Sequence, residues 1–222
     1  KQIKINNGNN INLEFKGTLR NKPINQEEIV EKYLQQIGFN ANLTNEENDK
    51  NNKGNSSALI ELKTGGGKTV IGLKILSIIN KKTIIFVHKT FLKDQWIERI
   101  NEFLPDAKIG IIQGQIIDIE NKDIVIAMIQ SISMKEYPES LFKDFGFSLY
   151  DEVHQLSSEV FSNCLKKCNT FYSLGLSATK KRKDGLTYVF KMYLGNICDI
   201  NYNIINDKDN VLVKVINYNI IG

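Results

Sequence analysis

The stretch Ile60–Lys74, IELKTGGGKTVIGLK, places a glycine cluster between a short apolar run and a helix-like apolar repeat. Glycines at such a point let consecutive backbone N–H groups turn inward and let phosphate oxygens approach closely. The first N–H groups of the following helix have no partner within the helix, so its positive end also faces a bound anion. The stretch therefore predicts a strand–loop–helix unit that holds phosphate groups.

Within this stretch, Lys68 and Thr69 carry the polar chemistry that a bound nucleotide needs. A lysine at this point reaches the β- and γ-phosphates, and the threonine hydroxyl ligates Mg²⁺. The candidate nucleotide-binding residues of the loop are Thr64, Gly65, Gly66, Gly67, Lys68 and Thr69. The general pattern G-x-x-x-x-G-K-[ST] is not met, because Leu62 stands in place of its first glycine. A glycine-rich turn that binds nothing is the alternative, and Gly-Lys-Thr alone does not separate kinases, transporters and motors.

Short apolar runs alternate with helix-like repeats through the rest of the chain. Short strands that are apolar on both faces and separated by helices predict an α/β fold, with a mostly parallel sheet covered by helices on both faces. Strands are expected at residues 58–62, 83–87, 108–112, 123–127, 147–150 and 171–176. Helices are expected at residues 69–79, 91–103, 158–167 and 186–194.

The chain is predicted to have four parts. Residues 1–39 are expected to form an N-terminal hairpin and an amphipathic helix that opens near Asn25. Residues 40–57 have almost no apolar content and are interpreted as a flexible, Asn-rich surface loop. Residues 58–199 form the α/β domain, and residues 200–222 return to a strand-like alternation.

Composition limits the classes of protein that need to be considered. The 222 residues suffice for one solid core, and the net charge of +4 permits a polyanionic partner without demanding one. No apolar run approaches the roughly 18 residues of a membrane span. Three cysteines without a framework spacing predict a reducing, intracellular compartment. The chain begins at Lys1 rather than Met, so a piece of a longer protein is expected.

Two adjacent carboxylates, Asp151 and Glu152, directly follow the predicted strand at 147–150. In an open parallel sheet, ligands bind outside the carboxyl ends of the strands, so both side chains are expected beside the phosphate loop. Asp151 is suited to hold Mg²⁺, directly or through water, and Glu152 to orient or deprotonate an attacking water. Taken alone, the pair has an ordinary solvated acidic turn as its alternative.

A third polar cluster follows the predicted strand at 171–176. Ser177, Ala178 and Thr179 end this strand, and small hydroxyl side chains suit a hydrogen-bond relay at a domain face. The basic run KKRK at 180–183, which includes Arg182, is suited to contact phosphates of a nucleotide or a nucleic acid. A plain strand exit and a solvated loop are the alternatives for these two features.

Three boxes in this order, G-K-T at 67–69, D-E-x-H at 151–154 and S-A-T at 177–179, resemble the first motor domain of superfamily 2 helicases and translocases. The branch is that of the DExH/DEAH-box proteins, grouped with XPB, type III restriction motors, and the helicases of poxviruses and giant viruses. Four further stretches resemble motifs of the same branch: FKGTLRNKPINQEEI at 15–29, VHKTFLKDQWIERI at 87–100, IVIAMIQSIS at 124–133 and SATKKRKDGL at 177–186. The resemblance implies a RecA-like P-loop NTPase domain, preceded by a small N-terminal β/α segment.

The resemblance also assigns roles to single residues. An apolar residue such as Leu62 is usual at this position in the family that the chain resembles. Lys63 and Lys180 stand where family members usually have proline. The side chain of Lys63 is expected either to contact phosphate or to face solvent. Arg20 and Gln26 are implied nucleotide contacts. The implied catalytic residues are Lys68, Asp151, Glu152 and His154, with Thr69 and Asp151 as ligands of Mg²⁺. The implied nucleic-acid track and coupling residues are His88, Lys89, Thr90, Gln130, Ser131, Ser177, Ala178, Thr179 and Arg182.

The resemblance implies ATP and Mg²⁺ as cofactors, and DNA as a partner that is held by its phosphate backbone, with RNA as the alternative. A C-terminal RecA-like domain of the same protein would supply arginine fingers, so this domain alone is expected to hydrolyse ATP slowly. The cytoplasm or nucleus of a host cell, a virion or a viral factory is the expected location. A small-molecule phosphotransferase and a non-catalytic scaffold with a relic ATP site are the competing interpretations.

Overall fold

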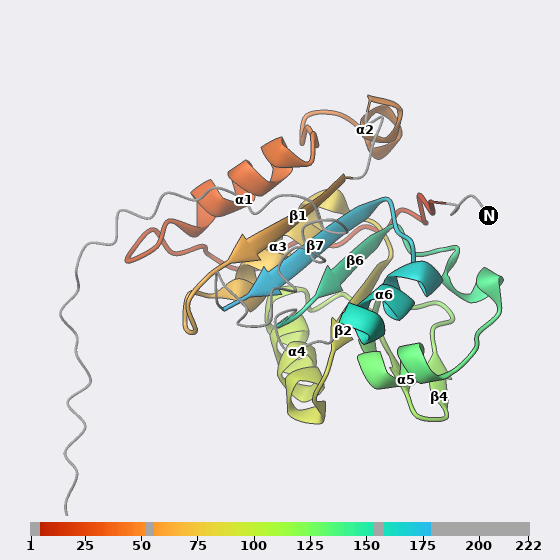
Figure 1. Cartoon of the computed structure of the whole chain (residues 1–222). Coiled ribbons are helices and arrows are strands. Elements are labelled where there is room, and N and C mark those ends of the chain that lie inside the picture. Colours follow the sequence, from red (N-terminus) through yellow and green to blue (C-terminus); the bar gives the residue numbers. More distant parts are fainter. Residues whose placement is uncertain (1–4, 52–55, 153–157, 179–222) are drawn as a thin grey trace, which may run out of the picture.

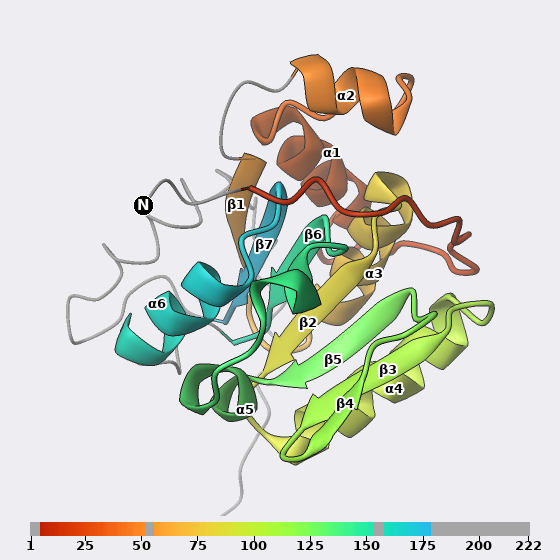
Figure 2. The same cartoon turned by 90° about the vertical axis from the view of Figure 1, so that its right-hand side faces the viewer.

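The computed structural model describes residues 5–51, 56–152 and 158–178. In these ranges, seven strands form one sheet in the order β1-β7-β6-β2-β5-β3-β4 (Figure 2). All neighbouring strands are parallel except β3 and β4, which are antiparallel. The predicted α/β fold with a mostly parallel sheet is confirmed.

The bounds of the elements follow the sequence expectations closely. The strands are β1 (Ser56–Glu61), β2 (Thr83–Val87), β3 (Ile109–Gln113), β4 (Ile116–Asp118), β5 (Ile124–Met128), β6 (Phe147–Tyr150) and β7 (Tyr172–Ser177). The helices are α1 (Gln26–Gln36), α2 (Asn45–Asn51), α3 (Lys68–Ile79), α4 (Thr90–Phe103), α5 (Ile129–Met134) and α6 (Ser158–Lys167), with a short 3₁₀ helix η1 (Glu139–Phe142). The predicted helix at 186–194 and the strand-like tail at 200–222 lie outside the described residues.

Helices cover both faces of the sheet. α1, α3 and α4 lie side by side on one face, and α5 and α6 lie together on the other (Figures 1 and 2). Strands β1, β2, β5, β6 and β7 are buried along their whole length, since both of their faces meet helices. Two apolar clusters result, one under each helical layer. In the described part of the chain, no helix combines the length and the apolar character that crossing a bilayer requires.

The predicted N-terminal hairpin is wrong for residues 5–18. No strand forms there, and Asn6 and Asn10 make only isolated bridges, to Thr170 and Lys81. The backbone of this segment instead bonds to the body of the domain; for example, the N–H of Leu13 donates to Asn80 Oδ1 at 2.9 Å. An Asn-rich alternation therefore satisfies its backbone groups against the domain instead of against itself.

The predicted flexible loop at 40–57 is wrong for Asn45–Asn51, which form α2. Asn48 is buried and donates to the carbonyl of Asn40 at 2.9 Å. Asp49 accepts from Lys81 Nζ at 2.8 Å and from the Tyr172 hydroxyl at 3.0 Å. Composition alone suggested disorder, but Asn48 bonds to carbonyls of its own segment and Asp49 bonds to two side chains on the body of the domain.

The helix predicted to open near Asn25 is confirmed as α1. The side chain of Asn25 accepts from the backbone N–H of Glu28 at 3.2 Å, which caps the first turn. Ile29, Val30 and Tyr33 bury the inner face of α1 in the same core as α3, so residues of the N-terminal segment are part of the domain. Strand β4 and helix α5 were not predicted.

Candidate functional site

A cavity of about 560 Å³ opens at the carboxyl ends of the parallel strands. Such a volume is within the roughly 300–1,000 Å³ of small-molecule sites. Its wall joins the phosphate loop after β1, the acidic pair after β6, the segment after β2, the outer face of α4 and the residues before α1. The lining residues are Thr18, Arg20, Gln26, Thr64, Gly65, Gly67, Lys68, Thr69, Val70, His88, Lys89, Phe91, Leu92, Gln95, Arg99, Glu102, Phe103, Asp151 and Glu152.

The phosphate loop takes the conformation that its glycines allow. Gly65 and Gly67 have φ angles of 84° and 81°, in the left-handed region that favours glycine. α3 begins at Lys68, directly after Gly67, and no side chain caps its first N–H groups. These N–H groups and the Thr69 side chain therefore lie beside the cavity, where the positive end of α3 suits an anion.

Lys68 and Glu152 meet in the wall of the cavity. Nζ of Lys68 lies 2.8 Å from Oε1 of Glu152, and the two side chains are only 10% and 18% exposed. Glu152 has a φ of 51°, an unusual conformation for a residue with a side chain, and it directly follows β6. The predicted meeting of the phosphate loop with the acidic pair is thus present as a direct ion pair.

Asp151 is more deeply buried than Glu152, with a relative exposure of 7%. Its Oδ2 accepts a hydrogen bond from Nε1 of Trp96, on α4, at 2.9 Å. Burial raises the pKa of Asp151 above its ordinary range, and the hydrogen bond from Trp96 opposes that rise. Oδ2 of Asp151 thus accepts a hydrogen bond from the protein core, while the residue still lines the cavity.

Residues 21–182 match the family described as type III restriction enzyme, res subunit (ResIII). The chain belongs to the ResIII family. Its sheet and helices form the RecA-like N-terminal domain of superfamily 2 helicases, so the family resemblance read from the sequence boxes is confirmed.

Curated relatives of this ResIII chain carry helicase and translocase names. A putative ATP-dependent RNA helicase of Acanthamoeba polyphaga mimivirus is 36% identical over 154 residues, which are 69% of this chain and 29% of the relative. A DNA 3'-5' translocase XPB2 of Sulfurisphaera tokodaii is 39% identical over 139 residues, 63% of this chain and 30% of the relative. The chain therefore matches about three tenths of each of these proteins.

Two solved structures share the ResIII chain's fold at low sequence identity. The UvsW helicase of bacteriophage T4 aligns with a TM-score of 0.54 and 18% identity, covering 83% of this chain and 68% of that one. The SWI2/SNF2 ATPase core of Sulfolobus solfataricus in complex with dsDNA aligns with a TM-score of 0.57 and 16% identity, covering 87% and 38%.

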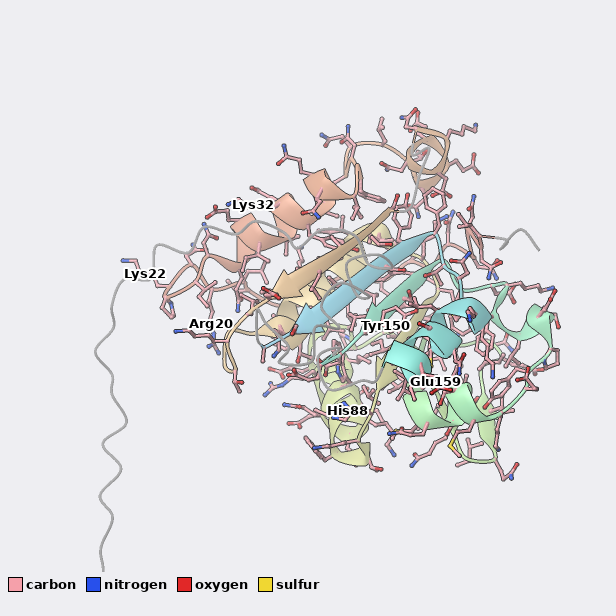
Figure 3. All side chains as sticks on the ribbon, in the orientation of Figure 1. Arg20, Lys22, Lys32, His88, Tyr150 and Glu159 are labelled. Atoms are coloured by element: carbon pink, nitrogen blue, oxygen red, sulfur yellow. The ribbon has the colours of Figure 1, made fainter. Side chains whose placement is uncertain are left out.

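In this ResIII domain, Gln26 joins the N-terminal segment to the phosphate loop. Its Nε2 donates to the carbonyl of Gly66 at 3.1 Å, and its Oε1 accepts from the backbone N–H of Arg20 at 2.9 Å. Gln26 is buried, whereas Arg20, which is labelled in Figure 3, is exposed. Both residues line the cavity. Lys63 is exposed and lies outside the wall of the cavity, so in this structure its side chain faces solvent.

The predicted track residues occupy the carboxyl ends of β2 and β5, which are adjacent strands. His88, which is labelled in Figure 3, directly follows β2. His88 and Lys89 both line the cavity. Nε2 of Gln130, on α5, donates to the carbonyl of His88 at 2.9 Å. Ser131 Oγ accepts from the N–H of Gly114 at 2.9 Å, which connects α5 to the turn between β3 and β4.

The coupling residues are only partly described. Ser177 ends β7 and is buried, and its carbonyl accepts from the N–H of Leu62 at 2.9 Å, just before the phosphate loop. Ala178 follows it and is half-buried. The predicted roles of His154, Thr179 and Arg182 concern positions outside the described residues. Thr90 begins α4 and is exposed.

One side of α4 contributes residues to the wall that the sequence boxes did not suggest. Phe91, Gln95 and Arg99 are spaced four residues apart, so they share one face of the helix and line the cavity. Phe91 is 62% exposed, an unusual environment for a large aromatic side chain in a described helix. The spacing of four residues between these side chains, on a helix that follows the strand next to the acidic pair, could have indicated from the sequence that they share one face. The further lining residues missed were Thr18, Val70, Leu92, Glu102 and Phe103.

Gly67→Ala is expected to weaken nucleotide binding at least about tenfold more than Gly65→Ala. Both positions have positive φ, so both variants carry backbone strain of roughly 1–3 kcal/mol. A Cβ on Gly67 would also lie 2.1 Å from Nε2 of Gln26 and displace the amide that holds Gly66, whereas a Cβ on Gly65 meets no atom within 4 Å. Equilibrium titration with a fluorescent ATP analogue measures both affinities, and equal losses would contradict the role given to Gln26.

Proposed function

We propose that this chain is the ATP-binding first motor domain of a nucleic-acid-dependent ATPase, which couples Mg-ATP hydrolysis to movement along DNA or RNA or to its unwinding. The ion pair between Lys68 and Glu152 carries the proposal, because it brings the phosphate-loop lysine and the acidic pair into one cavity. A scaffold with a relic site has no need of these side chains in contact. A small-molecule phosphotransferase gives no reason for the hydroxyl cluster after β7.

Each polar group in the cavity has a separate task in hydrolysis. The N–H groups at the start of α3 bind phosphate oxygens, and Lys68 exchanges its partner Glu152 for the β- and γ-phosphates. Released from the lysine, Glu152 accepts a proton from the attacking water. Thr69 and Asp151 are the residues that would hold Mg²⁺, and both line the cavity. The ion would neutralise charge that develops on the phosphate oxygens.

A nucleic acid would run past the carboxyl ends of β2, β5 and β3. His88, Lys89, Thr90, Gln130 and Ser131 lie along this edge, and the link from Gln130 to the His88 carbonyl joins the edge to the cavity. The names of the relatives support the partner, since they include a DNA translocase, an RNA helicase and an ATPase core bound to dsDNA. Backbone contacts of this kind predict weak sequence preference and binding that falls with salt.

The rest of the motor would come from a second RecA-like domain of the same protein. Its arginine fingers would approach the nucleotide at the open side of the cavity, an effect that amounts to about 10³–10⁵ in rate. An intracellular, reducing location goes with this role, and the free state of the two described cysteines, Cys164 and Cys168, supports it.

The test is the steady-state ATPase activity of the full-length protein with and without single- and double-stranded DNA and RNA. Coupling between two sites typically amounts to about 5–150-fold, so we expect at least one polynucleotide to stimulate turnover within that range. The stimulation is expected to decline as salt weakens phosphate contacts. Turnover that no polynucleotide changes would refute the motor function and favour a phosphotransferase, whereas a protein that binds no ATP would favour the scaffold.

A further inference from the structure

Trp96 lies where packing alone does not require a tryptophan. It occupies the buried face of α4, with 1% of its surface exposed, and its Nε1 donates to Oδ2 of Asp151 at 2.9 Å. A buried indole N–H without an acceptor would be unfavourable, and a phenylalanine would fill much of the same space without that demand. The hydrogen bond to a carboxylate is therefore the feature that distinguishes this residue from an ordinary core residue.

The same indole also contacts the helix that begins in the phosphate loop. A Cβ built on Gly72 of α3 would lie 3.4 Å from the Trp96 ring and 2.9 Å from Leu149 of β6. Gly72 is one turn beyond Thr69, so the ring is packed close to the first turns of α3 while its N–H reaches the end of β6. Trp96 thus packs close to α3, which carries Thr69, and bonds directly to Asp151, which follows β6.

The hydrogen bond constrains the direction in which Asp151 can bind a ligand. A carboxylate has two oxygens, and a donor from the protein core on Oδ2 fixes the rotation of the group. The carboxylate also accepts from the backbone N–H of Glu152, and Asp151 still lines the cavity in which a ligand would bind. Hydrogen bonds of this kind to metal-binding carboxylates orient the ligand, and their loss typically lowers metal affinity or activity by about 10–100-fold.

We propose that Trp96 is a positioning residue for Mg²⁺-nucleotide binding, which acts by holding the Asp151 carboxylate in its ligating orientation against the first turns of α3. The proposal rests on the proposed function, because it requires Asp151 to hold the ion. Trp96 itself is not among the residues that line the cavity.

The main test compares Trp96→Phe with the unchanged protein in a binding measurement that needs no turnover. A fluorescent ATP analogue is titrated at a series of Mg²⁺ concentrations. We expect the half-saturating Mg²⁺ concentration to rise about tenfold or more in Trp96→Phe, while affinity for the analogue in EDTA stays the same. A matched control is Tyr33→Phe, which removes another buried aromatic donor, the hydroxyl that bonds the Ser173 carbonyl at 3.0 Å. The control is expected to leave the Mg²⁺ dependence unchanged.

Trp96 is the single tryptophan of the chain, so intrinsic fluorescence gives a second test that does not depend on the folding of Trp96→Phe. Adding Mg²⁺ in the presence of ATP is expected to change the tryptophan emission at the same concentration that saturates binding. Asp151→Ala is expected to alter the emission without Mg²⁺ and to abolish the response to Mg²⁺.

The outcomes separate this inference from the proposed function. If the unchanged protein binds no nucleotide at any Mg²⁺ concentration, the proposed function fails and the inference with it. If nucleotide binding by the unchanged protein and by Trp96→Phe has the same half-saturating Mg²⁺ concentration, only the inference fails. The inference also fails alone if the tryptophan emission changes neither with added Mg²⁺ nor in Asp151→Ala. A double variant of Trp96 and Asp151 is expected to match Asp151→Ala alone, and additive losses would also overturn the inference.

Discussion

Glu152→Gln is expected to lower ATP turnover by about 10²–10⁴-fold, the usual contribution of a general base. The glutamine keeps the size of the side chain and its ability to accept a hydrogen bond, so the geometry after β6 is retained. It removes the negative charge of the carboxylate whose Oε1 lies 2.8 Å from Nζ of Lys68. In this variant, ATP binding no longer has to break the ion pair between Lys68 and residue 152. The affinity for ATP is therefore expected to stay equal or to rise.

Single-turnover hydrolysis and equilibrium binding, measured on the same preparation, separate these two effects. The matched control is Glu139→Gln in η1, an exposed glutamate outside the cavity, which should leave both quantities unchanged. A variant of Glu152 that hydrolyses ATP at the unchanged rate would show that another group activates the water. A parallel loss of binding and turnover would show that Glu152 acts by shaping the site.

The sheet was predictable because its strands are apolar on both faces. The bounds of β2 and β6 agree with the sequence expectation at both ends, and so do those of α6. In these elements, burial and local pattern favour the same structure. α5 was missed because Ile129–Met134 follows β5 without a turn signal, and six residues are too few for a helical period to be recognised.

Errors in the N-terminal part have a different origin. Residues 5–18 and α2 owe their placement to partners far away in the sequence, such as Asn80 for Leu13 and Lys81 for Asp49. The amino-acid composition of a segment does not show which distant residues it will contact. A polar segment that would be disordered by itself becomes ordered when its side chains are paired on a folded body, which a single sequence does not reveal.

The sequence predicted which residues form the candidate site better than it predicted the contacts between them. The phosphate loop and acidic pair converge because both follow parallel strands, and that rule needs no side-chain detail. The left-handed backbone of Glu152 and its pairing with Lys68 depend on the path of the chain after β6, so they emerged only from the structure. Trp96 is a buried core residue, and its bond to Asp151 depends on how α4 crosses the sheet.

Lys68→Ala and Lys63→Ala test how far the position of a charge in the loop matters. Lys68 lines the cavity, whereas Lys63, five residues earlier, is exposed and outside its wall. Removing a cation that is aimed at developing phosphate charge is expected to lower turnover by about 10²–10³-fold. Removing Lys63 deletes the same charge from the same loop and is expected to change turnover less than about twofold, because solvent screens an exposed charge.

ATP hydrolysis at saturating polynucleotide, with ATP affinity measured in parallel, gives the comparison. Lys68→Ala also removes the cation of a mostly buried ion pair, so the free energy of unfolding of this variant is expected to fall, while that of Lys63→Ala stays the same. Turnover that survives Lys68→Ala would rule out the assigned phosphate site. Equal losses in the two variants would mean that the loop acts through its total charge, and the lysine that replaces the family's usual proline would then be part of the site.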